Sequence, residues 1–358
     1  MSVVQEGVVF ENNPGQVSFS VPSPITALAN SGDSVVVGTE QGAFLVGISE
    51  LIPVPVYAEL GEPAETGSVL VALTRDSGTL IAAENGIFHI YQSQLLLSPL
   101  TEALAGMKVH SLALTGTGNN EIVWAATEEG LFAVNDSLFD QVIIAEESAA
   151  PTVIGSVNNV LIAAFDARVY EIYPGSWSYA ALPLLPGSVR AISANAGVAA
   201  LATDAGLVAR HSDGSYVRYT LSDTENALPV SAVAVDSQEQ IVGLLETGLA
   251  RVANNTVEGL ASFDENKAYQ HVAVDTLGNV WTSSEQRLIG WKTGTPVSFE
   301  TSVRGLLEAN CNSCHLSGVS APYQDFSDYG VAKALANDIV QRVSTGQMPP
   351  PPIPALTV

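Results

Sequence analysis

The sequence is poor in basic residues and in sulfur. Its 358 residues include 13 basic and 37 acidic side chains, but only two cysteines and three methionines. The net charge of −24 argues against nucleic acid or an anionic membrane surface as a partner. Residues 300–358 hold five acidic and three basic side chains, so the acidity belongs mainly to the N-terminal part. This acidity either keeps the protein soluble or steers a basic partner protein towards it.

Long apolar runs are also missing. No run of about 18 or more apolar residues occurs, so the sequence predicts no transmembrane segment. Residues 1–20 lack the basic region and the apolar stretch of a secretion signal. The length of 358 residues allows two domains.

Both cysteines lie in one short motif, Cys311-Asn312-Ser313-Cys314-His315. The spacing C-x-x-C-H is the attachment signature of a c-type haem. On one helical turn the two thiols can reach the two vinyl groups of a porphyrin and form thioethers. The adjacent His315 then points its imidazole at the iron. The sequence therefore predicts one covalent haem c.

Other readings of the motif fit less well. A redox-active dithiol usually lies at a strand-to-helix junction in a thioredoxin-like pattern. Half of a zinc site would need a second Cys/His pair to complete four ligands, and the chain holds no further cysteine. A chance match is disfavoured because the chain places both of its cysteines here.

Met348 is the candidate second ligand of the iron. It lies in Gly346-Gln347-Met348-Pro349-Pro350, and the other methionines, Met1 and Met107, are far from this segment in the sequence. Thioether ligation opposite a histidine raises the reduction potential and suits electron transfer. The alternative is a methionine that fills a gap in a core. Its position in a Gly/Pro-rich loop favours the ligand.

Residues 299–358 resemble a small class I cytochrome c domain. The matching parts are an expected amphipathic helix over 302–309, the C-x-x-C-H motif, a Pro-bearing loop, a helix and the Met-Pro-Pro loop. The resemblance implies thioether bonds at Cys311 and Cys314, proximal ligation by His315 and distal ligation by Met348. It also implies that the Pro322 carbonyl accepts a hydrogen bond from the proximal imidazole.

The resemblance departs from the family at its C-terminus. The family has a last helix that crosses the first one, whereas this sequence stops ten residues after Met348. We expect either that the natural chain continues or that another surface replaces this helix.

A second pattern recurs through residues 25–292. Each copy holds β-prone residues, a small residue, a polar turn, a glycine and another apolar pair, as in Val123-Trp124-Ala125-Ala126-Thr127-Glu128-Glu129-Gly130-Leu131-Phe132. The turn positions are Gly42, Gly86, Gly130, Ala167, Gly206, Gly248 and Arg287, about 37–44 residues apart. Each copy follows another short β-prone stretch and precedes a segment that can hold an outer strand.

Such a period in an all-β pattern predicts propeller blades, because one blade cannot bury both of its faces alone. Seven copies predict a seven-bladed β-propeller over residues 1–294, with 17–21 or 8–10 supplying the strand that closes the ring. The copies also resemble the propeller repeats of periplasmic sensor regions of two-component regulators. That resemblance implies the fold and no more about function.

The propeller histidines are scattered over four repeats. His110 and His271 fall on expected innermost strands, from which they can approach the central channel. They are either satisfied residues of the channel wall or part of a binding site. We favour a propeller that acts as a scaffold or docking surface.

Together, these features predict an extracytoplasmic electron carrier rather than an enzyme: an all-β propeller followed by a small all-α haem domain. Two alternatives remain. One is an oxidoreductase whose propeller binds a substrate or second cofactor, and the other is a haem-based sensor. Haem attachment takes place outside the cytoplasm, so we expect that a leader, with or without a lipid anchor, was removed. The expected partner is a redox protein, possibly basic.

Overall fold

The computed structural model describes most of the N-terminal part of the chain and separate positions in the C-terminal part. The described ranges are 16–47, 54–55, 57–58, 66–75, 78–91, 93–135, 138–182, 185, 187–195, 197–219, 229–253, 256–263 and 268–291, followed by Arg304, Leu307, Cys311, His315, Phe326, Val331, Ala332, Leu335, Ile339, Arg342, Val343 and Met348. The chain divides into two compact units, Met1–Thr293 and Gly294–Val358.

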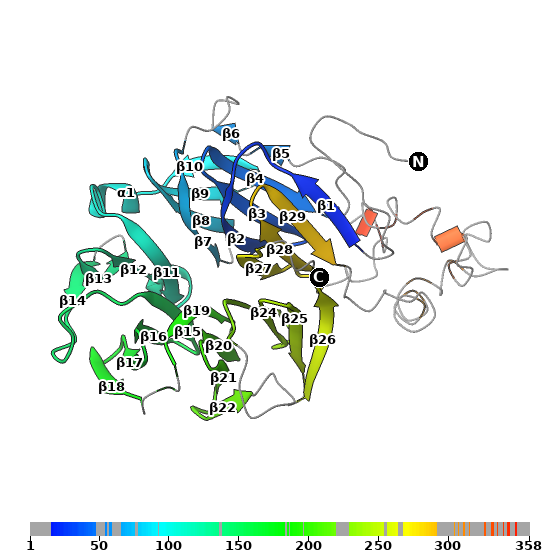
Figure 1. The fold of residues 1–358 in the computed structure, drawn as a ribbon. Helices are drawn as coiled ribbons and strands as arrows, with labels where there is room; N and C mark the ends of the chain where they lie inside the picture. The colour runs from blue at the N-terminus through cyan, green and yellow to red at the C-terminus, as the bar shows by residue number, and fades with distance from the viewer. Residues whose placement is uncertain are drawn as a thin grey trace. The chain divides into compact units, whose positions relative to one another are not determined.

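The first unit consists of seven antiparallel sheets around a common centre (Figure 1). In chain order, the first four sheets run from the innermost strand outwards as β2 (Ile25–Ser31), β3 (Ser34–Thr39), β4 (Gly42–Gly47) and β5 (Val54–Pro55); β7 (Val69–Arg75), β8 (Gly78–Ala83), β9 (Gly86–Tyr91) and β10 (Gln94–Leu97); β11 (Val109–Thr115), β12 (Ile122–Thr127), β13 (Gly130–Asn135) and β14 (Leu138–Val142); and β15 (Val153–Val157), β16 (Val160–Phe165), β17 (Arg168–Tyr173) and β18 (Ser178–Ala181).

The remaining three sheets repeat the same order. They are β19 (Val189–Ala194), β20 (Val198–Thr203), β21 (Gly206–His211) and β22 (Tyr216–Tyr219); β23 (Ala232–Val235), β24 (Ile241–Leu245), β25 (Gly248–Ala253) and β26 (Thr256–Ser262); and β27 (His271–Val274), β28 (Val280–Ser284), β29 (Arg287–Trp291) and β1 (Gln16–Ser20). The predicted seven-bladed propeller is therefore confirmed.

Strand β1 closes the ring. It pairs antiparallel with β29 from Gln16 opposite Trp291 to Ser20 opposite Arg287, so the last blade takes its outer strand from the start of the chain. Phe19 of β1 is 1% exposed and lies 5.9 Å from Trp281 between ring centroids. The predicted closing strand at 17–21 is confirmed, whereas 8–10 lies outside the described residues.

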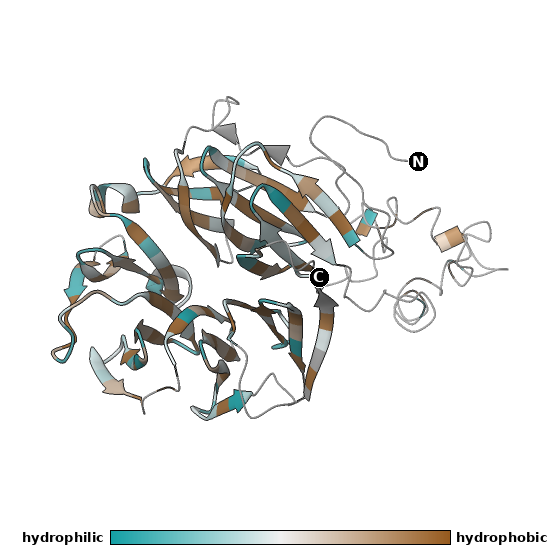
Figure 2. Cartoon of the chain, in the orientation of Figure 1, coloured by the Kyte–Doolittle hydropathy of each residue, from teal (hydrophilic) through white to brown (hydrophobic). Residues whose placement is uncertain are grey.

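Each blade packs its two faces against its two neighbours. Apolar rows on the strands form a separate buried cluster at every one of the seven blade interfaces; Val36 of the first blade, for example, shares a cluster with Ile81 of the second. Hydrophobic residues accordingly run along the strands in Figure 2. The core is thus a ring of interfaces rather than one central core.

The turn between the second and third strands shows why glycine recurs there. Gly42, Gly86 and Gly130 have φ near +140°, a region that residues with a side chain rarely adopt. In the fourth and seventh blades, arginine occupies the equivalent position, and Asp166 and Glu285 take a positive φ instead, at 62° and 52°. The register places Arg168 at this position, so the predicted Ala167 is one residue too early.

Two elements interrupt the four-stranded pattern. A single helical turn, α1 (Leu100–Ala103), links the second and third blades, and Ser98 Oγ accepts a hydrogen bond from the Leu100 N–H at 3.3 Å. Strand β6 (Tyr57–Ala58) pairs parallel with β10 and covers the outer edge of the second blade. The repeat pattern did not predict either element.

A buried ion pair joins the fourth and fifth blades. Arg210 Nε donates to Glu171 Oε1 at 2.9 Å, and both residues are less than a tenth exposed, at 5% and 7%. Tyr216 and Tyr173 donate their hydroxyls to the two oxygens of the same carboxylate at 2.8 and 2.5 Å. Burial alone would raise the pKa of Glu171, but the hydrogen bonds from Tyr173, Arg210 and Tyr216 outweigh it and lower this pKa.

Replacement of Phe19 by alanine should open a cavity at the closing interface. We expect Phe19→Ala to lower the free energy of unfolding by about 3–5 kcal/mol. Denaturant unfolding followed by tryptophan fluorescence measures this loss. Phe139→Ala, on outer strand β14 where Phe139 is 46% exposed, is the control and should cost clearly less. Equal losses would show that closure is not a special point of the ring.

Arg210→Ala should leave the Glu171 charge buried without its ion-pair partner and cost about 3–5 kcal/mol at neutral pH. The lowered pKa of Glu171 means that the ion pair contributes stability at neutral pH and loses it as the pH falls through that pKa. The difference between variant and wild type should therefore shrink in acid, as measured by denaturant unfolding at both pH values.

The control for this experiment is Arg190→Ala. Arg190 pairs with Asp204 at 2.7 Å, but its side chain is 58% exposed, so its loss should cost less than about 1 kcal/mol. A loss as large as that of Arg210→Ala would contradict the assignment of the stability to burial.

Candidate functional site

Three of the residues predicted to hold a haem are described by the structure. Leu307, Cys311 and His315 are joined by helical backbone hydrogen bonds, from the Cys311 N–H to the Leu307 carbonyl at 2.8 Å and from the His315 N–H to the Cys311 carbonyl at 3.1 Å. Residues four apart lie on one face of a helix. The first cysteine and the histidine of the motif therefore share a face with Leu307, which is 8% exposed.

This face belongs to the core of the second unit. Leu307, Phe326 and Ala332 are its buried residues, and Cys311, Val331, Leu335 and Ile339 pack against them. Val331, Leu335 and Ile339 are again spaced by four and joined by helical hydrogen bonds of 3.1 and 2.9 Å. Two helical faces thus supply the core against which Cys311 packs.

His315 is buried and has an incomplete set of hydrogen bonds. It is 9% exposed, and its Nδ1 is buried without a hydrogen-bond partner. Its ring stacks on that of Phe326, with centroids 4.5 Å apart and planes 14° apart. A buried polar atom without a partner costs about 1–3 kcal/mol, so such a histidine calls for a functional explanation.

Cys311 and Met348 complete the described part of the motif. Cys311 has a free, half-buried thiol whose pKa is raised by burial. Met348 is half-buried, and its N–H donates to the Arg342 carbonyl at 3.0 Å. No contact between Met348 and His315 is recorded among the described residues, and Cys314 and Pro322 lie outside them.

These features fit a covalently tethered haem. The histidine is buried with one ring nitrogen that lacks a partner, and a free thiol lies one helical turn before it on the same face. A soft thioether occurs further along the same unit at Met348. The donor set of one imidazole and one thioether is that of electron-transfer haems.

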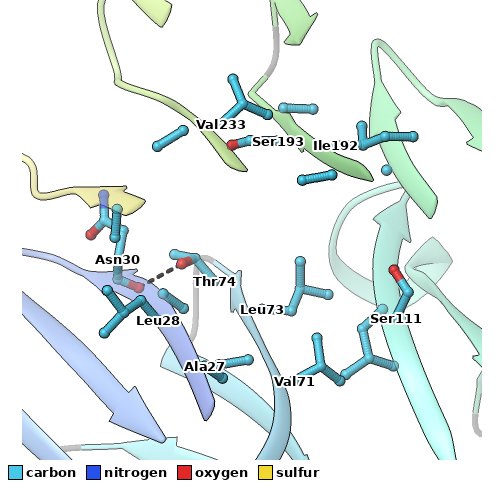
Figure 3. A pocket seen from close by; sticks show the side chains of 18 of the residues that line it. Ala27, Leu28, Asn30, Val71, Leu73, Thr74, Ser111, Ile192, Ser193 and Val233 are labelled. Carbon is cyan, nitrogen blue, oxygen red and sulfur yellow. Dashed lines mark hydrogen bonds between the residues drawn. The ribbon is translucent and has the colours of Figure 1, made fainter. Parts of the chain in front are cut away.

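The propeller holds a separate cavity of about 820 Å³ along its centre, between the seven innermost strands. Side chains from β2, β7, β11, β19 and β23 line it, as Figure 3 shows for Leu28, Val71, Ser111, Ile192 and Val233. His110 and His271 also line this cavity, so their predicted position is confirmed.

Both histidines already have hydrogen-bond partners. His110 donates its Nε2–H to the Pro151 carbonyl of the next blade at 2.9 Å. His271 Nδ1 lies 2.9 Å from Ser283 Oγ, and burial lowers the pKa of His271 although a backbone hydrogen bond with Thr26 opposes this shift. A neutral imidazole with bonded nitrogens is typical of a wall residue rather than of a metal ligand.

Other polar side chains of the channel perform the same task. Each innermost strand has an open edge, whose backbone groups need partners. Thr26 Oγ1 and Thr74 Oγ1 donate to the carbonyls of Val69 and Asn30 at 2.5 Å, the latter shown dashed in Figure 3. Asn195 Nδ2 donates to the Asp236 carbonyl at 2.6 Å. The channel polarity therefore joins blade to blade.

An acidic residue recurs at the mouth of the channel and was missed by the analysis of the repeats. The first turn residue after the second strand is acidic in every blade; these turn carboxylates are Glu40, Glu84, Glu128, Asp166, Asp204, Glu246 and Glu285. All are exposed except Asp204, which is half-buried beside Arg190. The hydrogen bond from the Arg190 guanidinium lowers the pKa of Asp204.

The register puts the turn carboxylates at one end of the channel. Each turn follows the residue paired with the start of an innermost strand, as Thr39 pairs with Ile25 and Thr127 with Val109. Hydrogen bonds between neighbouring innermost strands join start to start and end to end, so these strands run in the same direction. The sequence signal was present two positions before each turn glycine.

Over the described parts of the chain, no group of three or more His, Cys, Asp or Glu residues is placed to hold a metal ion. Within the same residues, no helix has the length and apolar character needed to cross a membrane.

No family model matches the chain, and no curated protein matches it. Solved structures do. A streptogramin B lyase is 14% identical, with a TM-score of 0.58 over 77% of this chain and 96% of its own. The extracellular domain of a hybrid two-component system from B. thetaiotaomicron is 11% identical, with a TM-score of 0.58 over 82% and 40%. The WD40 propeller domain of Doa1 is also 11% identical, with a TM-score of 0.59 over 79% and 99%.

The fold is shared; the function is not shown. Identities this low establish architecture only, and the matched proteins include a lyase and a WD40 domain with different names and roles. The seven-bladed propeller of this chain is thus supported both by its own sheet order and by known structures. Its function has to come from its own residues.

Proposed function

We propose that this protein is an extracytoplasmic electron carrier, with one haem c bound by residues 299–358 and a propeller, residues 1–294, that docks its redox partner. The observation that carries the proposal is the buried His315, which has a partnerless Nδ1 and follows the free thiol of Cys311 by one helical turn. A C-x-x-C-H motif on such a face matches haem attachment better than a dithiol or zinc site.

Each proposed ligand has a distinct task. Cys311 and Cys314 tether the porphyrin, His315 binds the iron from the proximal side, and Met348 binds it from the distal side. When bound, haem iron accepts and releases one electron between its ferric and ferrous states. The thioether of Met348 favours the reduced state and raises the potential. The apolar core around Leu307 and Phe326 keeps water from the proximal side.

The turn carboxylates are the proposed docking face for a basic redox partner. They place a ring of like charge around one mouth of the channel. Such a ring steers a basic protein during diffusion and raises its association rate at low ionic strength.

One alternative is supported by the channel itself. Its volume of about 820 Å³ suits a small molecule, so an oxidoreductase that binds a substrate there is the second candidate. The hydrogen-bonded state of His110 and His271 favours the electron carrier instead. A haem-based sensor would need a displaceable Met348.

Periplasmic production with haem-attachment machinery should give a low-spin protein with one haem per chain. Its oxidised spectrum should contain the weak long-wavelength band of a methionine–iron bond, and Met348→Ala should abolish that band because the thioether is lost. Met107→Ala is the matched control and should leave the spectrum unchanged. A high-spin spectrum insensitive to Met348→Ala would remove Met348 from the iron and favour catalysis or sensing. Failure of haem to attach would refute the proposal.

Neutralising the turn carboxylates should slow association with a small basic cytochrome c used as an electron acceptor. We compare Glu40→Gln, Glu246→Gln and Glu285→Gln together with Asp33→Asn, Glu121→Gln and Glu239→Gln, a triple variant at the other end of the blades. The first set should lower the low-salt rate of electron transfer several-fold and flatten its salt dependence, as stopped-flow measures. Equal effects of the two sets would show that net charge, rather than this face, steers the partner.

A further inference from the structure

Phe326 contacts His315 in two ways. The two rings stack with centroids 4.5 Å apart and planes 14° apart. The Phe326 N–H also donates to the His315 carbonyl at 3.2 Å. The loop that leaves the histidine therefore returns to it with both backbone and ring, a contact that helical spacing alone cannot produce.

Phe326 is itself held firmly. It is 5% exposed and belongs to the same buried cluster as Leu307 and Ala332. A buried phenyl ring of this kind cannot turn aside without opening a cavity. It therefore presents a flat and fixed surface to the imidazole.

The imidazole needs such a surface because little else restrains it. The torsion that rotates a histidine ring has broad minima. The buried Nδ1 of His315 has no hydrogen-bond partner in the described part of the chain that would fix the plane of the ring. Stacking at 4.5 Å limits rotation to orientations near parallel and covers one face of the ring against water.

We propose that Phe326 is the positioning residue of His315: it sets the plane of the imidazole and keeps water from it. The consequence at the iron rests on the proposed function, whereas the stacking itself is a property of the polypeptide. This separation allows the two ideas to be tested independently.

The first experiment uses the full-length, haem-free chain with selectively ¹³C-labelled histidine. The ring current of Phe326 should shift the carbon-bound protons of His315 upfield relative to the other four histidines. Phe326→Leu should abolish this shift, and Phe326→Tyr should retain it. Leu335→Ala removes apolar volume from the same cluster without removing the ring, so it should preserve the shift. Unchanged propeller resonances serve as the folding control.

The second experiment uses the haem-loaded protein. Phe326→Leu keeps the site apolar but removes the flat ring, so the EPR anisotropy that reports the imidazole plane should change while the reduction potential stays near that of the wild type. Phe326→Ala also admits water, which stabilises the ferric state, so its potential should fall as well. Phe326→Tyr should restore the EPR signature.

The outcomes separate the two proposals. If the wild type never binds haem, the proposed function fails, and the ring-current experiment alone decides the role of Phe326. If haem binds but Phe326→Leu leaves both the His315 resonances and the EPR signature unchanged, Phe326 does not position the histidine. A change seen equally in Leu335→Ala would reduce the effect to general core packing and overturn the inference.

Discussion

Lateral packing of blade against blade is the interaction on which this structure depends. No sheet of four short strands can bury both of its faces, and each of the seven interfaces holds its own apolar cluster. A ring of such interfaces is complete only when the last blade meets the first. The pairing of β1 with β29, with Phe19 against Trp281, supplies this closure. The start of the chain is therefore structural, although it lies outside the repeats.

Closure creates a channel whose walls are open strand edges. Threonine, serine, asparagine and histidine side chains of one blade bind backbone groups of the next, and this explains why polar residues occur on otherwise apolar innermost strands. His110 and His271 belong to this system of edge contacts. A channel whose polar groups are used in this way suits a rigid scaffold, and its exposed chemistry moves outwards to the turn carboxylates at its mouth.

The second unit is organised by helical spacing rather than by sheets. Leu307, Cys311 and His315 share a face, as do Val331, Leu335 and Ile339, and the two faces form one small core. A covalent tether suits so small a core, because it holds a large prosthetic group without a deep pocket. The proposed roles of Phe326 and of the apolar residues near His315 follow from the same economy of side chains.

The sequence by itself determined the seven blades, the approximate strand positions and the C-x-x-C-H motif, because period and spacing are local properties of a chain. It also located the closing strand and placed His110 and His271 on innermost strands. Tertiary structure decided what these residues contact: the ion pair of Glu171 with Arg210, the partners of the two histidines, and the stacking of Phe326 on His315. The shift of positive φ from glycine to Asp166 and Glu285 was likewise decided by register. Such contacts join residues far apart in the chain, and their geometry depends on how whole blades and helices pack.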